Sequence, residues 1–166
     1  MDFTHQIHLI PPVFDENSRI LILGSFPSMK SREVNFFYGH PQNRFWRVIS
    51  HLLNENCPET AIEKKHMLLK HKIALWDVIA SCDIKGSSDS SITNVVPNDI
   101  GKVLEQTKIK NIFVNGKTAD RLYIKYIEPD INIKAVCLPS TSPANAMWSL
   151  EKLIDEWRII TEFCEA

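Results

Sequence analysis

The chain has 166 residues, of which 44% are apolar and 23% are charged, which suits one globular domain spanning residues 1–166 with its own core. Its 19 Lys and Arg against 20 Asp and Glu give a net charge of −1, so the general basic excess of many nucleic-acid-binding proteins is absent. No apolar run is long enough to span a membrane and no signal-peptide pattern opens the chain, so we expect a cytoplasmic protein without membrane contact.

The first strand is predicted at residues 19–23, after an entry segment that covers residues 1–18. This apolar run lacks alternation, which is typical of a strand buried on both faces of a parallel sheet. It stops at Gly24, and Pro27 has no N–H to give to a neighbouring strand. The sequence therefore predicts a loop at the carboxyl end of a buried strand, where open α/β sheets build their sites.

The later part of the chain alternates between helical and strand patterns. Helices are predicted at 43–54, 58–70, 98–106, 117–127 (closed by Pro129) and 150–164, and strands at 73–79, 111–115 and 134–138. The Ser-rich segment 81–94 is predicted to be a long surface loop. This order predicts an α/β fold, a three-layer sandwich with a central four-stranded parallel sheet flanked by helices.

Metal and cofactor sites have little support in the sequence. The four cysteines lie far apart without a C-x-x-C pair, and the six histidines include no H-x-x-x-H pair. Phosphate-binding glycine motifs and the G-x-S-x-G nucleophile motif are also absent. We therefore expect no metal and no cofactor, and the usual nucleotide-binding and acyl-transfer functions are disfavoured.

Two loops with similar composition follow the first and fourth predicted strands, at 24–28 and 139–145. Both combine small residues, Pro and Ser or Thr, whose backbone N–H groups and hydroxyls can hold a phosphate or a polar ring. Lys30, Arg32, Arg44 and Arg47 cluster near the first loop, which allows a small basic face on a neutral body.

These loops resemble motifs of the uracil-DNA glycosylase superfamily. Gly24-Ser25-Phe26-Pro27-Ser28 and the string Tyr38-Gly39-His40-Pro41-Gln42-Asn43-Arg44-Phe45-Trp46 look like its first motif region, and residues 138–145 are similar to its last motif. Segments 74–82 and 94–99 also resemble it, most closely its hypoxanthine (deoxyinosine) DNA glycosylase branch. The combination of H-P-x-N-x-F-W with L-P-S-T-S-P-A is the specific part of the signal.

The chain departs from most of the superfamily at two positions. Phe26 stands where an Asp or Asn usually handles the attacking water, and Leu138 stands where His or Asn usually opens the last motif. The hypoxanthine branch is similar in lacking this pair, and its catalytic amide corresponds to Asn43. The resemblance implies hydrolysis of the N-glycosidic bond of a deaminated base in DNA by a monomer, with Asn43 orienting water and its carbonyl oxygen near the sugar cation.

The resemblance also implies roles for the surrounding residues. Base contacts are expected from Gly24, Ser25, Phe26, Pro27, Tyr38 (by stacking), His40 and Asp77. DNA phosphate or wedge contacts are expected from Ser28, Lys30, Ser140, Thr141, Ser142, Pro143, Ala144 and Asn145. Asp77 stands where relatives read the base with Asn, so it is either protonated by burial or points elsewhere.

Several alternatives remain open at the level of sequence. Asn43 can equally be the N-cap of the helix that follows it, and Phe45 and Trp46 are better assigned to the core than to base stacking. The base can be uracil or xanthine instead of hypoxanthine. Loss of the usual catalytic pair also fits a damaged-DNA-binding module that does not cut, and a nucleotide-binding domain unrelated to DNA is a further alternative.

Overall fold

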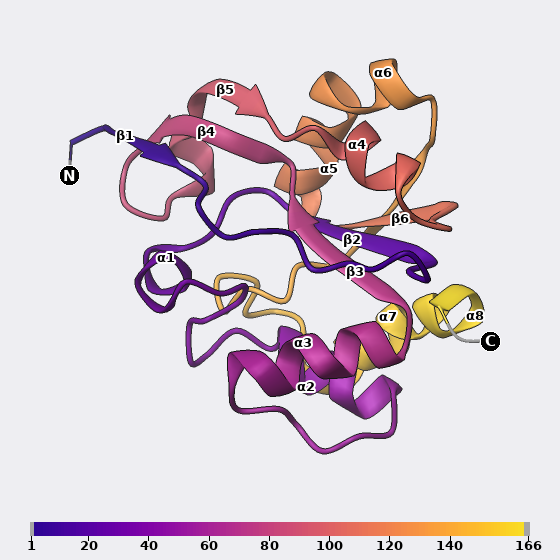
Figure 1. Ribbon diagram of the computed structural model, residues 1–166. Helices are drawn as coiled ribbons and strands as arrows, with labels where there is room; N and C mark the ends of the chain where they lie inside the picture. Colours follow the sequence, from indigo (N-terminus) through magenta and orange to yellow (C-terminus); the bar gives the residue numbers. More distant parts are fainter. Residues whose placement is uncertain (1, 165–166) are drawn as a thin grey trace.

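A four-stranded parallel sheet lies at the centre of the computed structural model, which describes residues 2–164 (Figure 1). Its strands are β2 (Ile20–Gly24), β3 (Ile73–Asp77), β6 (Asn111–Asn115) and β7 (Ala135–Leu138), in the order β3-β2-β6-β7. All three neighbouring pairs are parallel. The predicted α/β class and the four-stranded parallel sheet are confirmed.

Both faces of this sheet are covered, as the unbroken apolar pattern of β2 predicts. Ile20 and Ile22 pack in one cluster of core residues with helices α2 (Phe45–Leu52), α3 (Ala61–Lys70), α7 (Leu150–Trp157) and α8 (Thr161–Cys164). Leu21 and Leu23 point the other way, towards α4 (Ile100–Glu105) and α5 (Lys117–Tyr126). The helices therefore lie in two layers on either side of the sheet (Figure 1).

Helix boundaries differ from the predicted ones mainly at their ends. Side chains just before the helices accept hydrogen bonds from the first turn in α3, α4 and α7, where Thr60, Asp99 and Ser149 are the N-caps. The predicted closure at Pro129 is wrong. Helix α5 ends at Tyr126 and Pro129 lies in the first turn of α6 (Glu128–Ile131), where its missing N–H leaves no helical hydrogen bond unmade.

Three further differences concern short elements. Helix α1 (Met29–Val34) was not predicted, and 3-10 turns occupy Asp89–Ser91 and Arg158–Ile160. The second of these turns separates α7 from α8, so the predicted helix 150–164 is not continuous. Among the helices within residues 2–164, none combines the length and apolar content that crossing a bilayer requires.

A second, antiparallel sheet corrects two predictions. It consists of β1 (Thr4–Ile7), β4 (Ile79–Ile84) and β5 (Thr93–Pro97) in the order β1-β4-β5. The entry segment thus contains a strand, and the predicted surface loop 81–94 contains most of β4 and the start of β5. In β4 the buried Ile79, Cys82 and Ile84 are interspersed with less buried residues, as expected for a strand with one covered face.

The predicted strand 73–79 is interrupted after Asp77, and hydrogen bonds from Asn98 stabilise the interruption. The Asn98 Nδ2 group donates to the backbone carbonyls of Asp77 at 2.9 Å and Ile79 at 3.1 Å. The backbone N–H of Asn98 also donates to the carbonyl of Val78 at 2.8 Å. The chain can therefore leave the central sheet at Asp77 and enter the small sheet with its carbonyl groups satisfied.

Candidate active site

A cavity of about 600 Å³ opens at the carboxyl edge of the central sheet. Gly24, Asp77 and Asn115 end three neighbouring strands and all line it. In the sheet, β3 lies on one side of β2, and β6 and β7 lie on the other. The cavity therefore lies at the point where the strand order switches sides, a common place for ligands in open α/β sheets. Its volume is within the ordinary range for small-molecule sites.

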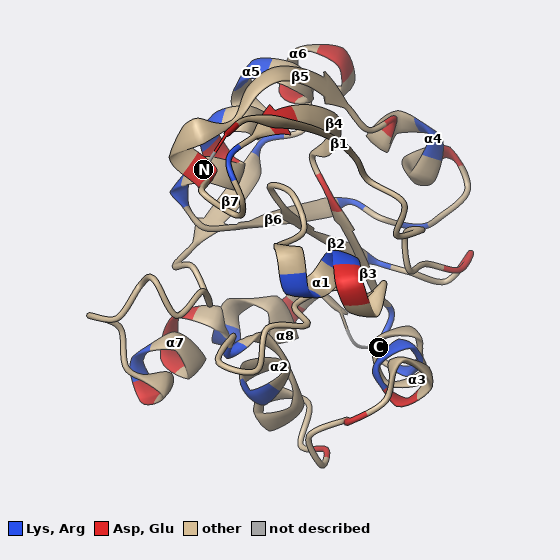
Figure 2. Cartoon of the chain, turned by 90° about the vertical axis from the view of Figure 1, so that its left-hand side faces the viewer, with Lys and Arg blue, Asp and Glu red and all other residues tan. Residues whose placement is uncertain are grey.

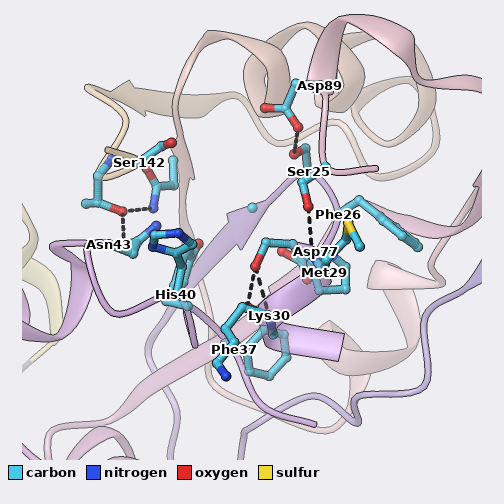
Figure 3. A pocket seen from close by; sticks show the side chains of 18 of the residues that line it. Ser25, Phe26, Met29, Lys30, Phe37, His40, Asn43, Asp77, Asp89 and Ser142 are labelled. Atoms are coloured by element: carbon cyan, nitrogen blue, oxygen red, sulfur yellow. Dashed lines mark hydrogen bonds between the residues drawn. The ribbon is translucent and has the colours of Figure 1, made fainter. Parts of the chain in front are cut away.

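The cavity brings together nearly all the site residues that the sequence predicts. Its wall includes Asn43, the base-contact set (Gly24, Ser25, Phe26, Pro27, Tyr38, His40 and Asp77), and Ser28, Lys30, Ser140, Thr141, Ser142, Pro143 and Ala144. Asn145 lines a neighbouring cavity instead. Asn43 and His40 lie on one side of the main cavity, and Phe26 and Asp77 lie on the opposite side (Figure 3).

The Asn43 amide has a fixed orientation. Its Oδ1 accepts hydrogen bonds from the backbone N–H of Phe45 and from the Thr141 hydroxyl, both at 2.9 Å. Its Nδ2 group makes no hydrogen bond to any residue within 2–164. The helix-start role and a place in the cavity therefore coexist, and the amide nitrogen is the part left for a ligand.

Thr141 holds the Asn43 side chain in place. Its side chain is fully buried, its hydroxyl accepts from the Asn115 Nδ2 group at 3.0 Å, and its backbone N–H donates to Asn115 Oδ1 at 3.0 Å. A buried hydroxyl with two partners does not face DNA, so the predicted phosphate contact of Thr141 is corrected to support of Asn43. Sequence reasoning missed Asn115, whose only signal was its place at the end of a strand.

Arg44 holds the loop that follows β7. Its guanidinium donates to the carbonyls of Ser142 at 3.0 Å, Asn145 at 3.1 Å and Trp148. Its backbone N–H donates to the carbonyl of Thr141 at 3.1 Å. The residue next to Asn43 thus fastens the loop that lies beside Asn43 on the cavity wall, and its guanidinium is directed to loop carbonyls instead of to solvent.

Asp77 is buried and paired with a residue that the sequence did not single out. The Asp77 side chain is 5% exposed, and its Oδ2 lies 2.7 Å from Nε2 of His8, which is 1% exposed. His8 directly follows β1, so the missed strand explains the missed partner. The His8 ring also packs edge-on against Phe26, with ring centroids 6.0 Å apart.

Tyr38 lines the cavity with its hydroxyl buried and one face of its ring covered. The ring stacks on Phe45 with centroids 4.1 Å apart and 20° between planes, so one ring face is covered. The Tyr38 hydroxyl is buried and has no hydrogen-bond partner among the described residues. Burial, together with the nearby Asp77 carboxylate, raises the pKa of this hydroxyl well above its usual range, so it stays protonated as a donor.

The remaining polar residues of the wall already have partners. Ser28 caps α1 by accepting from the Ser31 N–H at 3.1 Å, and the Ser25 hydroxyl donates to Asp89 at 3.3 Å. His40 Nδ1 accepts from the Gln42 N–H at 3.1 Å. Ser87 and Asp89, which sequence reasoning missed, also line the cavity.

Charges around the cavity are mixed. Lys30 lies 3.8 Å from Glu33, and Figure 2 shows both basic and acidic positions on α1 and α3. Phe45 and Trp46 are buried, which confirms their assignment to the core. Over residues 2–164, no three His, Cys, Asp or Glu side chains are grouped as a metal site would require.

Comparison with known proteins gives a consistent result. The model of the uracil DNA glycosylase superfamily matches residues 11–163. A Methanosarcina acetivorans protein named hypoxanthine DNA glycosylase is 39% identical over 155 residues, covering 90% of this chain and 94% of that protein. A Methanosarcina barkeri protein of the same name is 36% identical over 109 residues, covering 64% of this chain and 69% of that protein.

A solved structure also matches over most of the chain. The solution NMR structure of a protein from Methanosarcina acetivorans superposes with a TM-score of 0.77 at 37% identity. It covers 92% of this chain and 94% of the other. The likeness therefore extends over both sheets and the helices that flank the cavity.

Proposed function

Because the chain belongs to the uracil DNA glycosylase superfamily, we propose that it hydrolyses the N-glycosidic bond of hypoxanthine in DNA. Two relatives carry the name hypoxanthine DNA glycosylase, and the first is similar over nearly its whole length. The observation that carries the proposal is the Asn43 amide, held by Thr141 and Phe45 with its nitrogen unpartnered at a cavity of suitable size. The protein would act as a monomer on DNA containing a deaminated base.

The reaction begins with the base leaving the helix stack, at a cost of roughly a few kcal/mol that is least for a mispaired base. As the bond from the sugar to the base breaks, positive charge develops on the sugar and negative charge on the base. The backbone and side chains of Gly24, Ser25 and Phe26 form the wall against the departing base. Preorganised dipoles in such a wall act on the developing charge without reorganising.

Asn43 acts on the water through its nitrogen. Its Oδ1 accepts hydrogen bonds from Phe45 and Thr141, which fix the amide and leave the nitrogen as the donor for the water. An Nδ2–H donated to the water oxygen fixes the water while leaving a lone pair for attack. An amide is too weak a base to remove a proton early, so its contribution is positioning.

A methyl group on Gly24 is expected to block the cavity. A Cβ there would lie 2.4 Å from Asp77 Oδ1 and 3.0 Å from the Tyr38 hydroxyl, so Gly24→Ala should lower the rate on inosine DNA by about tenfold or more. Gly101→Ala is the matched control, since its nearest contact is 3.6 Å and the site is helical. Equal activity of both variants in single-turnover assays would contradict this use of the cavity.

The loop after β7 is the part that we propose to meet the DNA strand. Ser140 and Ser142, with Lys30 and Ser28 across the cavity, are the candidate phosphate contacts, and Pro143, Ala144 and Asn145 the candidate wedge. Met147 lies further along the same loop and is 92% exposed. An exposed flexible apolar side chain beside a DNA-facing loop suits insertion between bases.

Met147→Ala is therefore expected to slow cleavage of inosine in duplex DNA by roughly tenfold, because unstacking costs a few kcal/mol and the side chain offsets part of it. Cleavage in single-stranded DNA should change much less, since no stacked partner strand has to be opened. Ile62→Ala, on the outer surface of α3 and 82% exposed, is the control. An equal loss on both substrates would argue against a wedge role.

The decisive experiment exposes labelled duplexes carrying inosine, uracil or xanthine to the protein and then to alkali. Strand breaks at inosine support the proposal, and faster breaks at uracil or xanthine would change the assigned base. Shifted bands in a gel without breaks in any duplex would favour a damage-binding module. Absence of both binding and breaks would reject action on these lesions.

A further inference from the structure

Two polar atoms meet beside Gly24 on the cavity wall. Asp77 Oδ1 lies 2.4 Å, and the Tyr38 hydroxyl 3.0 Å, from the point that a Gly24 Cβ would occupy. Within the part of the chain that the structure describes, Asp77 Oδ1 makes no hydrogen bond, and the buried Tyr38 hydroxyl makes none of good geometry although it lies near the Asn115 side chain. Asp77 Oδ1 is therefore an acceptor on the cavity wall with its hydrogen-bonding capacity unused.

His8 decides which way Asp77 faces. Its Nε2 lies 2.7 Å from Asp77 Oδ2, a distance at which a ring N–H at Nε2 can donate to this carboxyl oxygen. This contact takes Oδ2 and leaves Oδ1 for the cavity. The donated proton also draws charge away from Asp77, which lessens its repulsion of a base that gains negative charge.

We propose that His8 is a positioning residue that holds Asp77 as an acceptor, so that Asp77 Oδ1 accepts a hydrogen bond from the N1–H of hypoxanthine. This inference rests on the proposed function. Adenine offers an acceptor at N1, so it would place one acceptor against another at Asp77 Oδ1. Guanine shares the edge of hypoxanthine, so its rejection depends on its stable pairing with cytosine and on the extra amine.

The test compares deoxyinosine with the unsubstituted purine deoxynucleoside, which lacks both O6 and the N1–H. His8→Leu should lower kcat/KM on inosine DNA by on the order of tenfold or more, with little change on the purine substrate. His8→Gln should keep most of the activity, because its side-chain amide can still donate to Asp77. His8→Asn is one methylene shorter and should behave like His8→Leu, which covers the case in which the leucine variant does not fold.

The matched control is His5→Leu. His5 lies on β1 and pairs with Asp83 at 2.9 Å, but its side chain is 61% exposed and neither residue lines the cavity. Unchanged inosine cleavage in His8→Leu, equal losses in the leucine and glutamine variants, or parallel losses on both substrates would each overturn the role of His8. A wild-type protein that leaves every inosine duplex intact would instead reject the proposed function.

Discussion

Asn43→Ala is expected to lower the single-turnover rate on inosine-containing duplex by about 100-fold or more, because positioning and preorganised hydrogen bonds commonly contribute that much. The change removes the amide nitrogen that we propose holds the water. It also removes the acceptor for the Phe45 N–H and the Thr141 hydroxyl, so the loop loses two hydrogen bonds. Melting temperature has to be measured beside the rate to separate these effects.

The Asn43→Asp variant separates the loss of the amide nitrogen from the loss of the two loop hydrogen bonds more sharply. A carboxylate keeps an oxygen for Phe45 and Thr141 but has no N–H to donate, so the variant should fold normally and still be inactive at neutral pH. Gln42→Ala, which changes an exposed neighbour, is the control and should retain activity. Full activity of Asn43→Asp would show that the oxygen and not the nitrogen is the working group.

Arg44→Ala is expected to destabilise the protein by about 3 kcal/mol, because three carbonyls of the loop after β7 lose a charged donor. For a chain of this size that corresponds to a fall in Tm of roughly 6–12 °C. Cleavage should also fall at temperatures where the protein is folded, since the same loop carries Thr141 and the proposed wedge. Thermal unfolding followed by circular dichroism, with the cleavage assay, measures both.

Arg47→Ala is the matched control for this prediction. Arg47 lies in the first turn of α2, which begins directly after Arg44. It is exposed and makes no ion pair with any residue in the described range 2–164. Arg44→Lys should recover little, because a single ammonium cannot reach three carbonyls as a planar guanidinium does. Equal melting temperatures for the Arg44 and Arg47 variants would contradict the role of Arg44 as a clamp.

The central sheet could be predicted because its strands carry their own signal. The apolar runs around Ile20, Ile73 and Ile112 are buried on both faces, and the helices between them have clear periodicity. The small antiparallel sheet could not, because β1 and β5 are polar and largely exposed, and β4 continues the apolar run of β3 after a single residue. Its strands depend on pairing with each other more than on local pattern.

The candidate site residues that the sequence indicates are those that stand together in short motifs. The loop after β2 and the loop after β7 reach one cavity, as their positions at strand ends imply, and the string around Asn43 joins them there. His8 and Asn115 have no such neighbours in sequence and matter only through contacts to Asp77 and Thr141. The sequence places Arg44 in a possible basic face, because nothing in the neighbouring residues indicates that its guanidinium turns inward to loop carbonyls.

Contacts between distant parts of the chain have a consequence for biosynthesis. The Asp77 pair spans 69 positions, the Asn43–Thr141 bond 98 and the Arg44–Trp148 bond 104. Closing such long loops is entropically unfavourable until the intervening elements have packed. A nascent chain still on the ribosome therefore lacks the complete cavity until its last segments emerge, so unfinished copies would neither bind the genome at lesions nor remove bases from it.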